Sequence, residues 1–170
     1  MQLRAPLILD LDGGVLPLPQ ARTLALQHWH DPLRFACRNA TLSRFATEVL
    51  RPLPAQLGTV MLGSGDFHHL SLPLLQRLHT RAPFQLVVLD NHPDNMRFPF
   101  GMHCGSWVNA AAALPQVSHV HVLGITSTER SPLFPQLPTV ASLYPGFSNY
   151  NWYGIFLPVN VPKDIAQKLH

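Results

Sequence analysis

The sequence predicts an α/β fold with a mainly parallel sheet. Short apolar runs with the length and composition of buried strands occupy residues 7–12, 59–62, 85–89 and 117–125. Segments with helical spacing of apolar residues lie between them, at residues 33–50, 70–79 and 107–114. Strands that alternate with helices in this way favour a parallel sheet covered by helices on both faces.

Glycines and prolines mark the ends of these elements. Gly13 and Gly14 end the first strand, and a proline-rich stretch over residues 15–32 reads as a loop. Pro52 ends the first predicted helix, whereas Pro73 is compatible with the first turn of the second helix. Residues 95–105 read as the loop before the third helix.

The composition changes near residue 126. All three tyrosines and both lysines lie beyond this point, and nine of the ten histidines lie before it. The later part predicts irregular structure over residues 130–147, a strand at 152–157 and a helix at 162–169. We therefore expect two segments, residues 1–125 and 126–170.

The charge distribution and the cysteine content indicate which kinds of partner and which cellular compartment to expect. The 170 residues carry a formal net charge of +3, but the arginines are scattered, which gives nucleic-acid binding little support. Cys37 and Cys104 are widely separated and read as free thiols of a reducing compartment. No apolar run is long enough to span a bilayer, and the first residues lack a secretory pattern, so a cytoplasmic location is expected.

Three polar side chains follow the predicted strand 85–89 at alternate positions, namely Asp90, His92 and Asp94. Ligands of open α/β sheets bind at the carboxyl ends of strands, and mixed oxygen and imidazole donors suit a divalent metal such as Mn, Fe or Zn. The alternative is an ordinary loop in which Asp and Asn cap the next helix and Pro93 sets a turn.

Further histidines could belong to the same site. His68 and His69 follow a glycine-rich turn after the strand 59–62, so either one could complete a metal set, or the pair could cap a helix. His103 lies in a glycine-flanked loop and could contact a substrate or carry a proton. His119 and His121 share one face of the last strand and read as sheet-face histidines.

Residues 59–125 resemble the arginase/agmatinase (ureohydrolase) superfamily through three successive motifs. These are Gly63-Ser-Gly-Asp-Phe-His-His69, Asp90-Asn-His-Pro-Asp94 and His103-Cys-Gly105. The resemblance implies a three-layer α/β/α sandwich, two Mn²⁺ ions that activate a water, and hydrolysis of a C–N bond in a guanidino or amidino substrate.

Residue roles follow from the same resemblance. Asp90 would bridge the two metal ions, Asp94 and either His68 or His69 would hold one ion, and His92 the other. His103 would be the catalytic or substrate-binding histidine. The family also needs a later D-x-D pair, which this chain lacks, because only Glu129 and Asp164 are acidic after Asp94. An inactive hydrolase, or a non-catalytic remnant that binds a metal or a partner, is therefore an alternative.

The later segment resembles a second family, the Bug (tripartite tricarboxylate transporter) solute-binding proteins. The resemblance covers Thr126–Ala141, Tyr144-Pro-Gly-Phe147, Trp152–Pro158 and Pro162-Lys-Asp-Ile165. It implies a fusion of two unlike parts, with a carboxylate-binding protein as a further alternative function. No binding residue is carried over from this family.

Two further expectations remain. Leu7-Ile-Leu-Asp10-Leu-Asp12 resembles the first motif of haloacid-dehalogenase-like phosphatases. In that family the two carboxylates would be the nucleophile and the acid/base, but the later motifs occur in the wrong order in this chain.

A sheet cut short would leave an unpaired edge, so association of identical chains is also expected.

Overall fold

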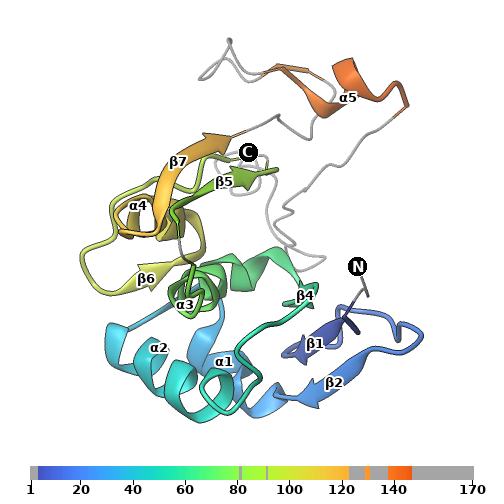
Figure 1. Ribbon diagram of the computed structural model, residues 1–170, viewed down its shortest axis with the longest axis vertical. Helices are drawn as coiled ribbons and strands as arrows, with labels where there is room; N and C mark the ends of the chain where they lie inside the picture. Colours follow the sequence, from blue (N-terminus) through green and yellow to red (C-terminus); the bar gives the residue numbers. More distant parts are fainter. Residues whose placement is uncertain (1–3, 81, 91, 123–128, 131–137, 147–170) are drawn as a thin grey trace, which may run out of the picture. The chain divides into compact units, whose positions relative to one another are not determined.

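The computed structural model describes residues 4–80, 82–90, 92–122, 129–130 and 138–146 (Figure 1). The chain divides into two compact units, residues 1–124 and residues 125–170. The first unit contains short helices and mostly parallel strand pairs. This arrangement confirms the predicted α/β class.

The first sheet has three parallel strands in the order β2-β1-β4. Strand β1 (Leu7–Asp10) lies in the middle, between β2 (Arg22–Ala25) and β4 (Val60–Met61). The first three residues of β1 are buried, as the apolar run predicts. Strand β2 lies in the stretch predicted to be a loop, because an edge strand that is mostly exposed carries little apolar signal.

A second sheet pairs β5 (Phe84–Val88) with β7 (Val117–Val122) in parallel. Leu86 and Val120 are partner residues that pack against the core. On the other face the exposed residues Val87 and His121 are partners. The apolar run predicts β5 as a fully buried strand, but the strand is buried on one face only.

The helix predicted over residues 33–50 is divided. A short helix, α1 (His30–Leu33), ends early, and α2 (Asn39–Phe45) begins six residues later and continues as a π-helix over Ala46–Leu50. Between them Phe35 has a positive φ of 60°, which no helix allows, and β3 (Ala36–Cys37) pairs antiparallel with β6 (Met102–His103).

Short helical segments connect the strands of the first unit. A 3₁₀ segment, Gln27–Trp29, precedes α1, a second one, Gly65–Leu70, leads into α3 (Ser71–Gln76), and a third, Cys104–Ser106, leads into α4 (Trp107–Ala112). One hydrophobic cluster extends from β1 through Phe45 and Phe67 to α4. The two sheets therefore share a single core.

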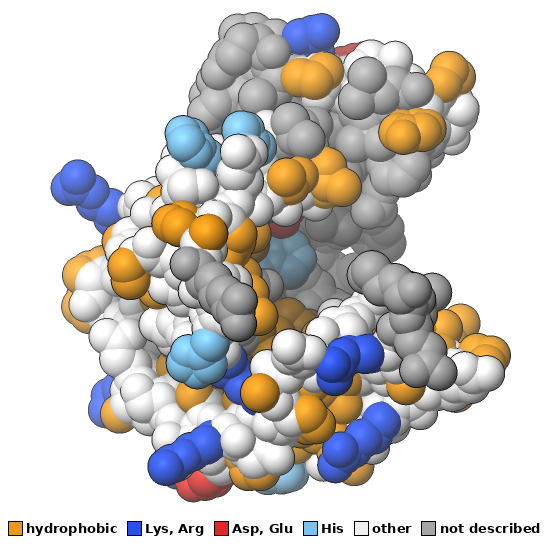
Figure 2. All heavy atoms as spheres, viewed as in Figure 1, with side chains coloured by type: hydrophobic (Ala, Val, Ile, Leu, Met, Phe, Trp, Pro, Cys, Tyr) orange, Lys and Arg blue, Asp and Glu red, His pale blue; other side chains and the backbone are white. Residues whose placement is uncertain are grey.

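In the second unit the described residues include one helix, α5 (Val140–Leu143). The strand predicted at residues 152–157 and the helix at 162–169 lie outside the described residues. None of the helices in the described parts of the chain has the length and apolar character needed to cross a bilayer. On the face drawn in Figure 2, the arginine side chains of the described residues (blue) are separated by neutral and apolar ones.

Candidate functional site

Three of the side chains singled out in the sequence meet at one point of the first unit. His68 comes from the 3₁₀ segment before α3, and Asp90 and Asp94 follow the carboxyl end of β5. The Nδ1 atom of His68 lies 3.0 Å from Oδ2 of Asp90 and 3.4 Å from Oδ2 of Asp94. One ligand atom from each residue fits within 4.8 Å of the other two.

Asp94 is a buried and firmly held member of this triad. Its side chain is 5% exposed, and the indole Nε1 of Trp107 donates a 2.7 Å hydrogen bond to Oδ2. Its carbonyl oxygen accepts a bond from the backbone nitrogen of Val108, in the first turn of α4. The backbone of Asp94 is left-handed, with φ of 46°, a conformation that Asp tolerates better than most residues.

The charges of the triad compensate one another in part. The hydrogen bond to Asp90 is the largest of the causes that raise the pKa of His68 to about 10. His68 is therefore an imidazolium at neutral pH in the cation-free protein, and it faces two carboxylates. Because 42% of the His68 side chain is exposed, the triad can be reached from solvent.

His92 does not join the triad. Its side chain is 74% exposed, and Nδ1 lies 4.0 Å from Oδ1 of Asp90. Its backbone nitrogen donates a 3.2 Å hydrogen bond to that same oxygen, so the residue helps to orient Asp90 while most of its ring lies in solvent. In a strand, alternate residues share one face, and for this reason the sequence pattern groups His92 with the aspartates. These residues lie in a loop, where alternate positions need not point the same way.

The structure also separates the two histidines between which the sequence cannot choose. His68 reaches the aspartates, whereas His69 is fully buried. Neither ring nitrogen of His69 has a hydrogen-bond partner among the described residues. Burial lowers the pKa of His69 to about 4, so this ring is neutral at physiological pH.

His103, expected to contact a substrate, forms a helix cap. Its Nδ1 accepts a 2.9 Å bond from the backbone nitrogen of Gly105, and its own backbone nitrogen donates to Oγ of Ser106. The acceptor role leaves the proton of the neutral ring on Nε2. The ring also packs beside Phe98, with 5.4 Å between ring centroids.

Asp10 and Asp12, which carry the phosphatase-like motif, stabilise the loops at the end of β1. Asp10 accepts a bond from the backbone nitrogen of Gly13, and Asp12 accepts bonds from those of Gly14 and Ser64. The carboxylate of Asp12 thus joins the loop after β1 to the loop after β4.

The triad has a donor set that a divalent cation would accept. One imidazole nitrogen and two carboxylate oxygens match the ligands of Mn, Fe or Zn sites, with water as the remaining ligand. His68, Asp90 and Asp94 would hold the ion, after His68 has released its proton.

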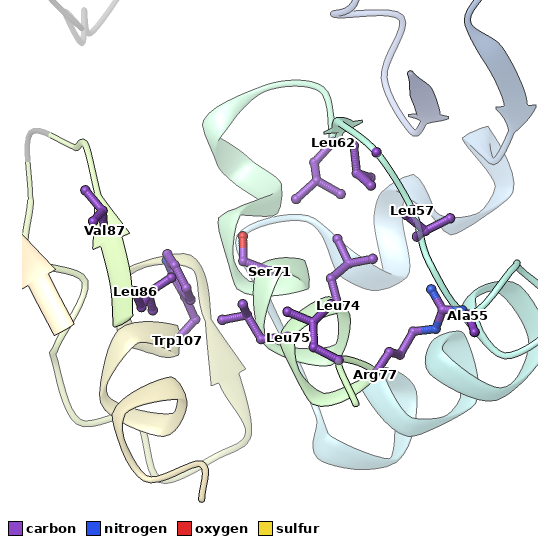
Figure 3. A pocket seen from close by; sticks show the side chains of 13 residues that line it. Ala55, Leu57, Leu62, Ser71, Leu74, Leu75, Arg77, Leu86, Val87 and Trp107 are labelled. Carbon is purple, nitrogen blue, oxygen red and sulfur yellow. The ribbon is translucent and has the colours of Figure 1, made fainter. Parts of the chain in front are cut away.

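An apolar pocket of about 380 Å³ lies beside α3 (Figure 3). Figure 3 shows Leu86 on one side, Leu62 and Leu74 on the other, and Leu75 of α3 between them. Trp107 lines the pocket and also binds Asp94, so the indole connects the pocket with the buried carboxylate. Arg77 and Ser71 are the polar side chains of the lining.

Sequence reasoning missed the contributions of Trp107 and Arg77. Trp107 reads simply as an apolar residue at the start of a helix, and no spacing rule relates it to Asp94. Arg77 is one of ten scattered arginines, and the carbonyl oxygens of Leu53 and Pro54 that hold it are distant in sequence.

Comparisons with known proteins relate the chain to one family. The family described as "Tripartite tricarboxylate transporter family receptor" matches residues 80–170. An "Uncharacterized protein" of Thermotoga maritima is 37% identical over 83 residues, which are 49% of this chain and 33% of that protein. The "UPF0065 protein in tcbD-tcbE intergenic region" of Pseudomonas sp. (strain P51) is 38% identical over 53 residues, 30% of this chain and 16% of that protein.

The chain therefore spans a third or less of the length of these curated relatives. No solved structure matches it.

These findings overturn the interpretation of the chain as an arginase-class, manganese-dependent hydrolase. The receptor-family match begins at residue 80, so it includes Asp90, His92 and Asp94, on which the ureohydrolase resemblance depends. Carboxylates and histidines often gather at the carboxyl ends of parallel strands in unrelated α/β proteins, so their convergence is a weak family signal. The match also covers the whole of the later segment, which carries the transporter resemblance. The chain belongs to the tripartite tricarboxylate transporter receptor family.

Proposed function

We propose that this chain is a ligand-binding protein of receptor type whose ligand is a small carboxylate. The family match over residues 80–170 is the observation that carries this proposal. A binding role needs a preformed cavity with a few well-placed polar groups, and it needs no reactive side chain.

The pocket beside α3 supports the proposal. Its volume of about 380 Å³ falls in the range of roughly 300–1,000 Å³ that is common for small-molecule sites. Arg77 lines it, and the described residues of its lining include no Asp or Glu, so its electrostatics favour an anion. Hydrogen bonds of 2.9 Å from Nη2 to the carbonyl oxygens of Leu53 and Pro54 fix the position of this guanidinium.

Calorimetric titration with carboxylates of different shape tests this function. Because most of the lining is aliphatic, we expect an aromatic or branched monocarboxylate to bind more tightly than citrate, and its amide analogue to bind weakly. The Arg77→Met variant should lose most of the affinity for the carboxylate. Arg97→Met, at an exposed position outside this pocket, is the matched control. Equal affinity of wild type and Arg77→Met would contradict the proposal.

The triad favours a second candidate function, which is binding of a single divalent cation without catalysis. The observation behind it is the group of three ligand atoms within 4.8 Å, contributed by His68, Asp90 and Asp94. Mn²⁺ is a suitable probe because its EPR signal reports the free ion. We expect Asp90→Asn to weaken binding strongly and Asp31→Asn, at a side chain that is 96% exposed, to leave it unchanged. Identical titrations for the two variants would rule out this site.

A further inference from the structure

The exposed face of the β5–β7 sheet carries a pair of histidines that lies outside the triad and the pocket. His119 and His121 are alternate residues of β7, so both side chains leave the same face of the strand. Both are exposed, and their rings are stacked with 6.2 Å between centroids and 24° between planes.

A hydrogen bond from the neighbouring strand orients one of the two rings. Nε2 of His121 lies 2.9 Å from Oε1 of Gln85, on β5. An amide oxygen can only accept a hydrogen bond, so Nε2 carries the proton and Nδ1 of the neutral ring keeps its lone pair. Histidines that bind metals commonly donate their second ring nitrogen to an oxygen in this way.

The ring separation is compatible with a shared ion. A metal–nitrogen bond of about 2.0–2.1 Å places the ion roughly 3.2 Å from the ring centroid, so two rings on one ion have centroids up to about 6.4 Å apart. That limit places the two nitrogens on opposite sides of the ion, whereas a tetrahedral ion would bring the centroids to about 5.2 Å. The stacked rings, 6.2 Å apart, must therefore rotate toward one another, which their exposed positions permit.

We propose that His119 and His121 form a two-imidazole surface site for a divalent transition metal, with Gln85 as its positioning residue. Imidazole ligands suit Cu²⁺, Ni²⁺ and Zn²⁺, and among these Cu²⁺ binds most tightly to nitrogen donors. Water completes the coordination sphere. The triad offers one imidazole nitrogen and two carboxylate oxygens, so the number of nitrogens bound to Cu²⁺ separates the two sites.

The test is a Cu²⁺ titration of the full chain without an affinity tag, followed by calorimetry and by EPR. We expect a site with nitrogen hyperfine splitting from two imidazoles. His119→Asn and His121→Asn should each remove one nitrogen from the EPR signal. Gln85→Leu should lower the affinity for Cu²⁺ about tenfold, and each histidine substitution should lower it further. His79→Asn, at another exposed histidine, should bind Cu²⁺ like the wild type.

The variants also separate this site from the triad. Asp90→Asn should leave the two-nitrogen EPR signal intact, whatever its effect on Mn²⁺ binding. A wild-type signal in the His119→Asn/His121→Asn double variant, with circular dichroism showing a folded protein, would overturn the proposal. So would a single-nitrogen signal in the Asp90→Asn variant, in which the triad is weakened as a competing site for Cu²⁺.

Discussion

Asp94 is a buried carboxylate that depends on donors from two other segments of the chain. Trp107 donates to Oδ2 from α4, and His68 approaches the same oxygen from the segment before α3. A hydrogen bond to a charged group contributes more than one between neutral groups, and a buried acceptor that loses its donor is costly. Trp107 therefore contributes to stability through its polar atom as well as through its ring.

We expect Trp107→Phe to lower the free energy of unfolding by about 2–4 kcal/mol, because the loss of the hydrogen bond adds to a smaller loss of packing. Urea denaturation measures the change. A double-mutant cycle with Asp94→Ala, which removes the acceptor, isolates the bond between the two side chains. Additive effects of the two substitutions would show that the indole acts through packing alone.

Asp12 makes a pH-dependent contribution at the end of β1. Burial acts to raise its pKa, but hydrogen bonds from Ser64 and Gly14 outweigh burial, and the pKa lies below its ordinary value. A carboxyl group with a lowered pKa in the folded state stabilises the protein above the unfolded-state pKa, about 3.9. That stabilisation is lost as the pH falls through the lower, folded-state value.

Asp12→Asn should therefore cost about 1 kcal/mol at pH 6 and less at pH 3. Urea denaturation at the two pH values measures both differences. The control is Asp31→Asn, whose side chain is 96% exposed and should change stability little at either pH. A cost for Asp12→Asn that stays constant between pH 6 and pH 3 would contradict the assignment of its lowered pKa.

At the scale of elements, β3 and β6 show what the sequence can and cannot predict. The runs that form β1, β5 and β7 are predictable because their apolar residues are local and dense. The pair β3–β6 joins residues 36–37 to 102–103, and each strand is too short to have a period of its own. Such strands form only because two segments distant in sequence come into contact, and no local sequence pattern predicts that contact.

The same limit applies to the triad. The motif around Asp90 and Asp94 is visible in the sequence, and the glycine-rich turn draws attention to His68 and His69. The choice between the two histidines depends on the 3₁₀ segment that turns one ring toward the aspartates and buries the other.

Gly101 permits the approach of β6 to β3. Its φ is 146°, and a Cβ atom there would overlap the carbonyl oxygen of Cys37 and crowd Cα of Arg38 at 2.9 Å. We expect Gly101→Ala to destabilise the chain by about 3 kcal/mol or more, from strain and displacement of β6 together. Thermal denaturation measures the loss.

Gly13→Ala is the matched control for this prediction. Gly13 also has a positive φ, 71°, but no atom of the described residues lies within 4 Å of the place that its Cβ would take. Only the backbone cost of about 1–2 kcal/mol should remain there. Similar losses of stability for Gly101→Ala and Gly13→Ala would show that the close approach of Gly101 to the backbone of Cys37 and Arg38 is unimportant.

At the scale of the first unit, one core connects two sheets that share no strand pairing among the described residues. Leu9 of β1, Leu70 before α3 and Val108 of α4 belong to the same hydrophobic cluster. A continuous core predicts that the β2-β1-β4 sheet and the β5–β7 sheet unfold together. Two separate cores would let one sheet open while the other stays closed.

Leu70→Ala tests this coupling because Leu70 is completely buried. The cavity should lower the free energy of unfolding by about 2–5 kcal/mol. Native-state amide hydrogen exchange should show this loss in β1 and in β5 alike. Leu16→Ala, at a side chain that is 79% exposed, should leave both strands unchanged. If β1 loses protection while β5 and β7 keep theirs, the sheets fold independently, and the pocket between Leu62 and Leu86 is a boundary that can open.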